Sequence, residues 1–442
     1  MKAVTVKTVR SAGVVGAGGA GFPTHVKVSA EADTVLLNAA ECEPLLHKDK
    51  QVLQHFADEV LAGFAAVRDM VGAERGIIGI KAKYSDVIDL LQSKLPEGIE
   101  IAPLQDAYPA GDEFILVYDV LGRVVPPGGI PLNVGAVVVN VETAMNVALS
   151  PQRPVTEKFV SVAGSVENPC TLRVPVGTPL SSCVSTAGGA TVPDPHYIVG
   201  GVMMGRLTED HDEPVLKTTG AVLVFGGEHT VTRRYARTDR QRDLIGKSAC
   251  DQCTFCTELC PRYLLGHPIE PHKAMRSLEF NLVGEPDVIG TSFCCECNLC
   301  SMYSCPEDLD PKDVCAVNKR RLAAEGRKWT DPPFNPRRAE VHLNNRKAPM
   351  RRLITKLGLD GFHNVGPLLA ESPQPASVKL PLSQHVGAPC QPGVKVGQKV
   401  SVGEPVAIPP EKGGKPALGA AIHASIDGKV TAVDESAVTI ER

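Results

Sequence analysis

Residues 247–261 read KSACDQCTFCTELCP. Four cysteines follow one another in the pattern C-x2-C-x2-C-x3-C-P, at Cys250, Cys253, Cys256 and Cys260. Two-residue gaps allow a tight loop to present three thiolates to one side of a [4Fe–4S] cubane, and a run closed by a cysteine–proline pair is typical of such a cluster. The stretch therefore predicts an iron–sulfur domain in the second half of the chain.

A second run, FCCECNLCSMYSCPEDLDP, occupies residues 293–311 and has one extra residue before its last cysteine. In paired runs the fourth cysteine binds the cluster of the other run, because it cannot reach the cube that its own loop surrounds. We therefore predict two clusters, the first bound by Cys250, Cys253, Cys256 and Cys305, and the second by Cys294, Cys297, Cys300 and Cys260. Cys295 is either a spare thiol or an alternative ligand, and we favour the spare thiol.

Zinc is the other metal that such cysteines could bind. Nine of the 14 cysteines lie between Cys250 and Cys305, and in a reducing cytosol this clustering favours a metal over disulfides. Zinc sites, however, pair two C-x2-C knuckles with four ligands in all. Two longer runs, each closed by a cysteine–proline pair, fit zinc poorly, so we expect clusters that carry single electrons.

Length and composition restrict the class of protein further. A chain of 442 residues is long enough for several domains, and 43% hydrophobic with 22% charged residues indicates a globular protein. The net charge of −4 excludes the strongly basic overall charge that is typical of nucleic-acid-binding proteins. The N-terminal residues lack the apolar region of a signal peptide, and the most apolar run, at 132–149, is interrupted by polar residues, so no membrane span is predicted.

A glycine-rich stretch near the N-terminus, GAGGAGFPTHVK at residues 16–27, is a candidate phosphate-binding loop. Gly16, Gly18 and Gly21 satisfy the G-x-G-x-x-G pattern of dinucleotide sites, but Pro23 comes too soon for the usual helix start. The stretch is therefore either a phosphate-binding loop or a glycine-rich surface turn. Glycines let backbone N–H groups approach a phosphate closely, and Lys27 adds a positive charge.

Three later segments place polar residues where strands are expected to end. They are LLNAAECEP at 36–44, YPAGDEF at 108–114 and GAVVVNVETAMNV at 135–147. The last of these is a buried apolar strand that runs into Asn140, Glu142 and Thr143. Open α/β sheets bind ligands at the carboxyl ends of their strands, so these segments are expected to line one site.

Together with the glycine-rich stretch, these segments resemble the flavoprotein subunit of respiratory complex I and the C subunit of Rnf-type electron-transport complexes. The resemblance implies a Rossmann-like domain over residues 1–155 that binds FMN, with NADH stacking on the flavin. It implies that the following residues contact the two cofactors: Gly16, Gly18, Gly19, Lys27, Asn38, Glu41, Tyr108, Gly111, Asp112, Glu113, Asn140 and Thr143. Asp112 and Glu113 would orient the nicotinamide. Two departures concern nucleotide binding: Ala40 stands where the complex I pattern has an aspartate, and Asp112 replaces a glutamate.

The rest of the chain predicts a multidomain α/β plus β fold. Residues 156–210 are strand-rich and resemble the β-grasp, soluble-ligand-binding module of the same families. Residues 240–325 would form a helical ferredoxin-like domain around the clusters. Residues 326–375 would form a basic linker with helical segments, and residues 376–442, with short alternating strands and glycine turns, resemble a lipoyl-like barrel-sandwich domain. We expect this last domain to be a docking module.

The stretch 316–356 is strongly basic in a chain that is acidic overall. It holds twelve lysines and arginines against three acidic residues, a net charge of +9. We favour a solvated helical face followed by a linker. The alternative is a docking patch for an acidic redox partner, where complementary charge would mainly speed the encounter.

The position of the barrel-sandwich domain at the end of the chain, and the absence of a long extension after the clusters, resemble the cobalamin reductases of bacterial propanediol-utilisation microcompartments. This resemblance implies a cytoplasmic, NADH-dependent enzyme that uses FMN and two [4Fe–4S] clusters to reduce cobalamin from Co(III) to Co(II) or Co(I) for a B12-dependent diol dehydratase. Its partners would be NADH, a corrinoid and microcompartment proteins such as an adenosyltransferase or shell proteins. The alternatives are a peripheral NADH-oxidising C-type subunit of an Rnf-like ion-pumping complex, and a non-enzymatic electron relay.

Overall fold

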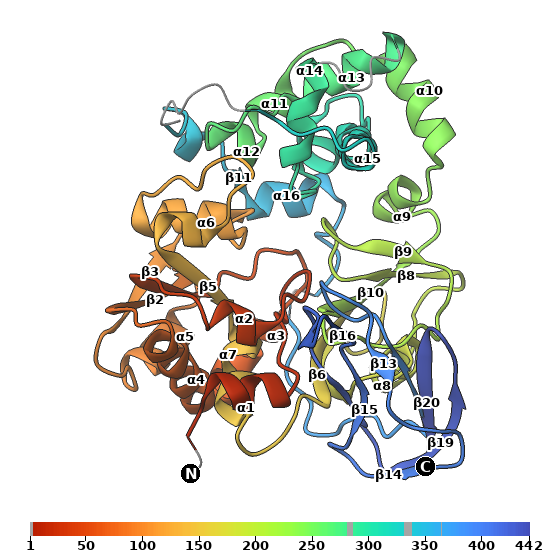
Figure 1. The fold of residues 1–442 in the computed structure, drawn as a ribbon. Helices are drawn as coiled ribbons and strands as arrows, with labels where there is room; N and C mark the ends of the chain where they lie inside the picture. Colours follow the sequence, from red (N-terminus) through yellow and green to blue (C-terminus); the bar gives the residue numbers. More distant parts are fainter. Residues whose placement is uncertain (1–2, 281–285, 331–337, 364) are drawn as a thin grey trace.

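The computed structural model describes residues 3–280, 286–330, 338–363 and 365–442. The N-terminal α/β domain, the β-grasp sheet and the C-terminal β-domain form the lower part of the molecule in Figure 1, and the helical cysteine-rich domain lies above them. Both termini lie at the bottom of this view. Among the helices that the described ranges contain, none is both long and apolar enough to cross a membrane.

The N-terminal domain is built on a four-stranded parallel sheet in the order β3-β2-β1-β5. Its strands are β1 (Thr34–Ala39), β2 (Arg75–Lys81), β3 (Ile99–Leu104) and β5 (Ala136–Asn140). Apart from α1 (Val6–Ser11) and α2 (Thr24–Lys27), which precede the sheet, its helices are α3 (Lys48–His55), α4 (Ala57–Met70), α5 (Ser85–Gln92), α6 (Glu113–Leu121) and α7 (Val141–Leu149). The central strands are continuous apolar runs because helices cover both of their faces.

Close packing of α4 against α7 fixes the position of the last strand and its helix. A Cβ on Gly63 of α4 would lie 1.8 Å from the carbonyl oxygen of Ala144 in α7, so this contact requires glycine. The sheet core beside it is fully buried, with Val35, Leu37 and Val60 at 0% exposure. The strand ends at Asn38 and Asn140 are thereby held on a rigid scaffold.

The second domain is a five-stranded mixed sheet in the order β7-β6-β10-β8-β9. Its elements are β6 (Glu157–Gly164), β7 (Cys170–Pro175), α8 (Leu180–Thr186), β8 (Pro195–Val199), β9 (Arg206–Thr208) and β10 (Ala221–Gly226). The central strand β10 pairs parallel with β6 and antiparallel with β8. The sheet thus extends past residue 210, where the sequence pattern ended, because the loop at 209–220 separates β10 from the other strands.

The cysteine-rich domain is helical, as the sequence predicted. Its elements are α9 (Thr230–Tyr235), α10 (Asp239–Ala249), α11 (Phe255–Glu258), α12 (Pro261–Leu264), α13 (Pro271–Phe280), α14 (Pro286–Ile289), η2 (Gly290–Phe293), η3 (Cys300–Ser304) and α15 (Pro311–Ala324). Helices α13 and α15 pack against each other, and their apolar cluster includes Cys305 with Cys250 and Cys294 packed beside it.

The basic segment that follows α15 packs on the first two domains. It contains η4 (Leu343–Asn345), β11 (Ala348–Pro349) and α16 (Met350–Lys356). Strand β11 pairs with β4 (Ala107–Tyr108) of the first domain, and the N–H of Leu369 bonds to the carbonyl of Thr171 in the second. Several of its basic side chains are exposed, such as Arg351, whereas Arg337 lies outside the described residues.

The C-terminal β-domain consists of a four-stranded sheet, β12-β20-β19-β14, a three-stranded sheet, β13-β15-β18, and a hairpin, β16-β17. Its strands are β12 (Ser377–Pro381), β13 (Gln391–Pro392), β14 (Lys399–Val400), β15 (Pro405–Ile408), β16 (Glu411–Lys412), β17 (Lys415–Pro416), β18 (Ile422–His423), β19 (Gly428–Val433) and β20 (Ala437–Glu441). The alternating residues of β12 and β20 face a shared apolar core that includes Val378, Leu380 and Ile440. Val176 of the second domain joins this core, so the two domains pack together.

Candidate functional site

The glycine-rich loop lies between α1 and α2 and precedes β1, whereas the glycine loop of a standard dinucleotide site follows a strand. A bridge between Val15 and Pro23 closes its base, and the N–H of Gly16 bonds to the carbonyl of Phe22 at 3.0 Å. A Cβ built on Gly19 would meet no described atom within 4 Å. The tip of the loop therefore faces open space.

One side of this loop rests on the end of β5. The N–H of Ala17 donates to the buried hydroxyl of Thr143 at 2.9 Å. A Cβ on Gly18 would lie 2.9 Å from the side-chain nitrogen of Asn140, so the loop approaches Asn140 closely. Asn140 is paired in register with Asn38 of β1. The structure thus brings the glycine loop to the carboxyl ends of two adjacent parallel strands.

The predicted segment YPAGDEF, at residues 108–114, packs on the end of β1. The side-chain amide of Asn38 donates to the carbonyl of Gly111 at 2.8 Å. The N–H of Gly111 points at the Sγ of Cys42 at 3.3 Å, and a Cβ on Gly111 would lie 2.8 Å from the carbonyl oxygen of Ala40. This approach requires glycine, and it places the start of α6 beside β1.

Lys27 and Glu113 form an open ion pair at the same edge of the sheet. Their Nζ and Oε1 atoms are 3.6 Å apart, and the side chains are 30% and 46% exposed. Lys27 also donates to the carbonyl of Val138 in β5 at 2.8 Å. A partly exposed cation and a partly exposed carboxylate therefore stand next to the glycine loop, where solutes can reach both.

Three of the predicted cofactor residues have mainly protein partners. Tyr108 is 1% exposed, and its hydroxyl donates to the carbonyl of Cys297 at 2.6 Å. The carboxylate of Asp112 caps α6 and is paired with Arg262. Glu41 accepts the N–H of Glu43, and burial, followed by the nearby charge of Asp49, raises the pKa of Glu41.

A buried network of charged residues lies beside the loop, and among its four members only Glu142 belonged to a segment that the sequence patterns indicated. Lys48, Asp49, Glu142 and Lys158 are each no more than 4% exposed. Lys48 bonds to Asp49 at 2.6 Å, Lys158 pairs with Glu142, and burial lowers the pKa of Lys158 to about 8. The network supports the loop at two points. The Nζ of Lys158 donates to the carbonyl of Ala17 in the loop at 3.3 Å, and Asp49 accepts a hydrogen bond from Asn140, which contacts the loop, at 2.8 Å.

The observed arrangement fits FMN. A loop of glycines with open space at its tip offers backbone N–H groups to a phosphate, and Lys27 offers a positive charge beside it. The side chains of Asn38 and Asn140 lie at neighbouring strand ends, where such folds bind ligands. Phe22, which is 37% exposed, adds an apolar surface at the end of the loop.

The first cysteine group gathers the residues predicted for the first cluster. Burial, and then the neighbouring thiols of Cys305, Cys250 and Cys253, raise the pKa of Cys256 to about 12. Cys305 belongs to the second run, and its thiol lies near the thiols of Cys250 and Cys256 in the first. Four thiols from a C-x2-C-x2-C loop and a remote C-P pair are the donor set of a [4Fe–4S] cluster.

The second cysteine group encloses a small pocket. Its thiols are Cys260, Cys294, Cys295, Cys297, Cys300 and Cys315. The group contains the four predicted ligands of the second cluster and two further thiols. Cys315 of α15 is 0% exposed, and the sequence did not indicate it because it lies ten residues beyond the last C-P pair.

The two cysteine loops share an unusual backbone conformation. Gln252 and Thr254 have φ values of 61° and 70°, and Glu296 and Asn298 have φ values of 58° and 63°. Residues other than glycine rarely adopt this left-handed region. The four residues occupy the second and fourth positions after Cys250 and after Cys294, so Cys294 is the structural counterpart of Cys250, and Cys295 corresponds to Asp251 of the first loop, which is not a cysteine.

The extra residue of the second run is absorbed in one helical turn. In the first run an α-helical turn, α11, carries Cys256, whereas in the second run Cys300 begins a π-helical turn, η3. A π-turn contains one more residue than an α-turn. The backbone then returns to the same conformation at the fourth cysteine, with φ and ψ of −67° and 121° at Cys260 and −72° and 121° at Cys305.

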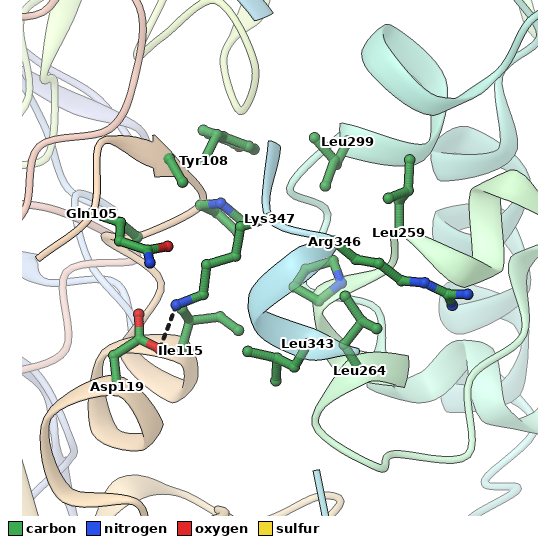
Figure 2. Close-up of a pocket in the computed structure, with 14 residues that line it drawn as sticks. Gln105, Tyr108, Ile115, Asp119, Leu259, Leu264, Leu299, Leu343, Arg346 and Lys347 are labelled. Atoms are coloured by element: carbon green, nitrogen blue, oxygen red, sulfur yellow. Dashed lines mark hydrogen bonds and ion pairs between the residues drawn. The ribbon is translucent and has the colours of Figure 1, made fainter. Parts of the chain in front are cut away.

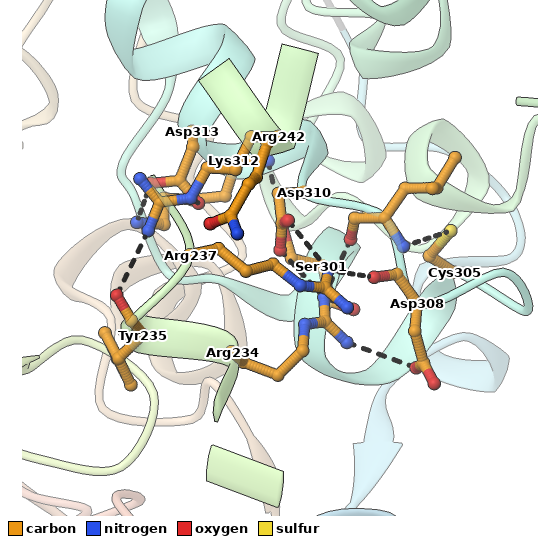
Figure 3. Close-up of polar contacts among 12 residues, drawn as sticks. Arg234, Tyr235, Arg237, Arg242, Ser301, Cys305, Asp308, Asp310, Lys312 and Asp313 are labelled. Carbon is orange, nitrogen blue, oxygen red and sulfur yellow. Dashed lines mark hydrogen bonds and ion pairs between the residues drawn. The ribbon is translucent and has the colours of Figure 1, made fainter. Parts of the chain in front are cut away.

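Arginines hold the loop that carries Cys305 (Figure 3). Arg234 of α9, 7% exposed, donates to the carbonyls of Ser301 and Leu309 at 3.2 and 2.8 Å and to Asp310 at 2.9 Å. These partners lie on both sides of Cys305 in the chain. The N–H of Leu309 in turn points at the Sγ of Cys305 at 3.4 Å. Arg234 therefore fixes the loop that presents the crossing thiol.

A pocket separates the N-terminal and cysteine-rich domains, and Figure 2 shows residues from both lining it. Tyr108 and Ile115 come from the N-terminal domain, whereas Leu259 and Leu299 come from the cysteine-rich domain. Lys347 of the basic segment pairs with Asp119 at 2.7 Å across the lining. Leucine and isoleucine side chains make up much of the wall, so we interpret this pocket as the seam between the domains.

Four family models match the chain. The model described as Nuo51 FMN-binding domain matches residues 9–149, and the SLBB domain matches residues 159–207. The 4Fe-4S dicluster domain matches residues 249–310, and the RnfC barrel sandwich hybrid domain matches residues 367–442. These matches and the observed topology confirm the predicted multidomain fold class.

An FMN-binding fold joined to an iron–sulfur domain defines a flavin- and iron–sulfur-containing oxidoreductase. Two curated relatives named cobalamin reductase PduS, from Salmonella typhimurium and Citrobacter freundii, are each 42% identical to the chain, over 98% of its length and 95% of their own. The chain belongs to the PduS family of cobalamin reductases. It is also 34% identical, over 58% of either chain, to the C subunit of the Na(+)-translocating ferredoxin:NAD(+) oxidoreductase complex of Acetobacterium woodii.

Proposed function

We propose that the protein is an NADH-dependent cobalamin reductase that carries electrons from NADH to the cobalt of a corrinoid with the help of FMN and two [4Fe–4S] clusters. One NADH supplies two electrons, which suffice to reduce two Co(III) centres to Co(II) or one Co(III) centre to Co(I). A bound flavin accepts an electron pair as hydride, and iron–sulfur clusters carry single electrons, so the cofactors supply the redox chemistry. The single observation that carries this proposal is the 42% identity, over 98% of the chain, to the proteins named cobalamin reductase PduS.

The ligand sets proposed for the clusters are those that the crossing pattern predicts. The first cluster would be bound by Cys250, Cys253, Cys256 and Cys305, and the second by Cys294, Cys297, Cys300 and Cys260. The matched conformations of Cys260 and Cys305 support this assignment. The matching left-handed residues also support the interpretation of Cys295 as a spare thiol, because the equivalent position in the first loop is Asp251, which is not a cysteine.

The N-terminal residues would bind and orient the flavin and the nicotinamide. Gly16, Gly18 and Gly19 would hold the phosphate end, together with Lys27. Exposure of the Glu113 carboxylate supports a role in orienting the nicotinamide. For Asp112 we propose an indirect role. Its carboxylate caps the N-terminus of α6 and forms an ion pair with Arg262, and both contacts hold the first turn of α6, which begins at Glu113.

Two other functions use a similar set of cofactors. The similarity to the C subunit of the A. woodii complex favours a peripheral, NADH-oxidising component of an Rnf-like complex as second candidate, although that similarity spans 58% of each chain. A non-enzymatic electron relay is the third candidate, and Ala40 is the residue that suggests it. Bleaching of the flavin absorbance by NADH under anaerobic conditions would exclude the relay.

We also propose that the protein works within a bacterial microcompartment of the cytoplasm, with an adenosyltransferase or shell proteins as partners. The family membership supports this location. Co-purification with intact microcompartments tests it, and recovery of the protein with the membrane fraction would favour the Rnf-like alternative.

The test of the activity is an anaerobic assay of purified protein loaded with FMN and iron–sulfur clusters. NADH and cob(III)alamin are supplied, and a quinone and a ferredoxin are compared as rival acceptors. We expect cob(II)alamin to form faster than either rival acceptor is reduced. A preference for the ferredoxin or the quinone, or zinc in place of iron in the isolated protein, would contradict the proposal.

A further inference from the structure

The C-terminal β-domain contacts the end of the glycine-rich loop. The N–H of Val386 donates to the carbonyl of Ala20 at 3.1 Å. A Cβ on Gly21 would lie 3.0 Å from the Cα of His385, and Gly21 itself has a φ of 75°. Residues more than 360 positions apart in the chain are therefore in direct backbone contact, and glycine is required at this contact for both its φ and its lack of a side chain.

The start of the same loop is tied to the C-terminal domain by a buried lysine. Lys217, from the loop before β10, is 2% exposed. Its Nζ donates to the carbonyl of Gly13 at 2.8 Å and to the carbonyl of Ala421 at 2.7 Å. The N–H of Lys217 bonds to the side chain of Gln384 at 3.2 Å. One side chain thus links three domains, and its two carbonyl partners would be costly to leave unpaired.

Close backbone packing accompanies this lysine. A Cβ on Gly13 would lie 2.3 Å from the carbonyl oxygen of Ala421, and Gly13 has a φ of 65°. The amine of Lys217 is held away from water, and this burial lowers its pKa to about 8. A neutral amine still has two N–H groups, so it can keep both hydrogen bonds.

The loop is consequently held from two sides. Asn140 and Thr143 of the first domain contact its middle, at Gly18 and Ala17. Lys217 and Val386 contact residues at its two ends, whereas Gly19 at the tip faces open space. A free glycine-rich loop samples many conformations, and fixing it in advance reduces the entropy that a ligand must overcome on binding.

We propose that Lys217 and the C-terminal β-domain are part of the flavin site, where they hold residues 13–21 in the conformation that binds the FMN phosphate. The C-terminal domain is therefore a positioning element for the flavin, in addition to any docking role. This inference rests on the proposed role of the glycine loop in binding FMN.

The test measures FMN affinity in full-length variants. Lys217→Met keeps the length of the side chain and removes both hydrogen bonds, and we expect the dissociation constant for FMN to rise at least tenfold. Lys217→Arg retains donors for the two carbonyls and should stay within about threefold of the wild type. Lys379→Met, which removes an exposed lysine from β12 of the same domain, is the matched control and should leave FMN affinity unchanged.

A second variant keeps the proposal testable if Lys217→Met does not fold. Val386→Pro removes the N–H that Ala20 accepts without altering Lys217, and it should weaken FMN binding in the same direction. A purely structural role would lower the melting temperature of the FMN-free protein and leave the FMN dissociation constant, measured well below melting, at the wild-type value. That result would overturn the inference.

The outcomes also separate this inference from the proposed function. Wild-type protein that binds FMN, together with Lys217→Met and Val386→Pro variants that bind it equally well, overturns the inference and leaves the proposed function intact. Wild-type protein that fails to bind FMN overturns both. Iron content should be unchanged in every variant, because the cysteine loops lie in another domain.

Discussion

Arg262 and Asp112 form a two-bond ion pair between the cysteine-rich domain and the N-terminal domain. The Nη1–Oδ1 and Nη2–Oδ2 distances are 2.6 and 2.9 Å, and the side chains are 8% and 14% exposed. The guanidinium also stacks over the ring of Phe114 at 4.0 Å. Since Arg262 follows Cys260 by two residues and Asp112 precedes Glu113, this pair links the two candidate sites.

Arg262→Met should separate these sites. It leaves the carboxylate of Asp112 buried without its cation, which typically costs about 3–5 kcal/mol when a buried pair is broken. We expect a lower melting temperature and a raised KM for NADH, with FMN still bound. Arg240→Met, at an exposed position on α10, is the control. Wild-type stability in Arg262→Met would contradict the importance of the pair.

Glu113→Ala should lower NADH oxidation by at least tenfold without affecting iron content. The carboxylate is half exposed beside Lys27, so its removal leaves the fold intact and takes away a group that orients the nicotinamide. Flavin bleaching by NADH in stopped flow measures the effect. Glu97→Ala, an exposed acid of the same domain, serves as the control. Loss of iron in Glu113→Ala would refute the assigned role.

Cys253→Ala and Cys295→Ala form a matched pair of cysteine variants. If the loop register is correct, Cys253→Ala removes one cluster, so iron falls from about eight to about four atoms per chain, whereas Cys295→Ala keeps both clusters. Iron and sulfide analysis with EPR of the reduced protein measures this. FMN should remain bound in both variants, and its loss in Cys253→Ala would show that the two domains do not bind their cofactors independently.

Arg234→Met should destabilise the first cluster specifically. The substitution removes the bonds to Ser301, Leu309 and Asp310 that hold the Cys305 loop. We expect faster loss of about half of the iron during anaerobic incubation with a chelator. Arg233→Met, at the exposed neighbouring position on α9, should lose iron at the wild-type rate. Equal rates for the two variants would count against a role for Arg234 in holding Cys305.

Glu43 should make stability dependent on pH. Burial raises the pKa of Glu43 from 4.5 to about 7, although its carboxylate accepts the N–H groups of Met203 and Met204. The fold therefore disfavours the ionised form, so this contribution to stability is present below about pH 4.5, is lost as the pH rises towards 7, and stays lost above it. The loss is roughly 3 kcal/mol at most.

Melting temperatures at pH 5 and pH 8 measure this effect. Glu43→Gln cannot ionise, so its melting temperature relative to the wild type should be higher at pH 8 than at pH 5. Glu435→Gln, at an exposed position in the C-terminal domain, should show no such difference. A constant offset between Glu43→Gln and the wild type at both pH values would show that Glu43 does not titrate in this range.

The cysteine loops were predictable because their chemistry is local. Spacing within each run indicates which three thiols can face one side of a cluster, and the structure places the left-handed residues at matching positions in both loops. The parallel sheet was predictable for a similar reason, because continuous apolar runs such as Ala136–Val139 mark strands covered on both faces. The sequence did not indicate that η3 would absorb the extra residue, since an insertion can be accommodated in several ways.

Long-range pairings could not be read in the same way. Arg262 with Asp112, Lys158 with Glu142, and Lys217 with the carbonyls of Gly13 and Ala421 leave no periodic pattern in the chain. Each of these partnerships depends on which surfaces the domains bury against one another. The sequence alone does not distinguish a charged residue that is exposed to water from one that is buried and paired with another charge.

Cysteine spacing was thus sufficient to predict iron–sulfur clusters, and the resemblance of several short motifs to known families predicted FMN and the types of domain, because both signals lie in short stretches of the chain. The two sets of four cysteines stay a prediction. The packing of distant segments determined which polar side chains remain free for a ligand. It engaged Asp112 and Tyr108 with protein partners, left Lys27 and Glu113 open to solvent, and brought the C-terminal domain onto the glycine loop. Desolvation and contact across domain boundaries decide these features, and neither is encoded in the spacing of neighbouring residues.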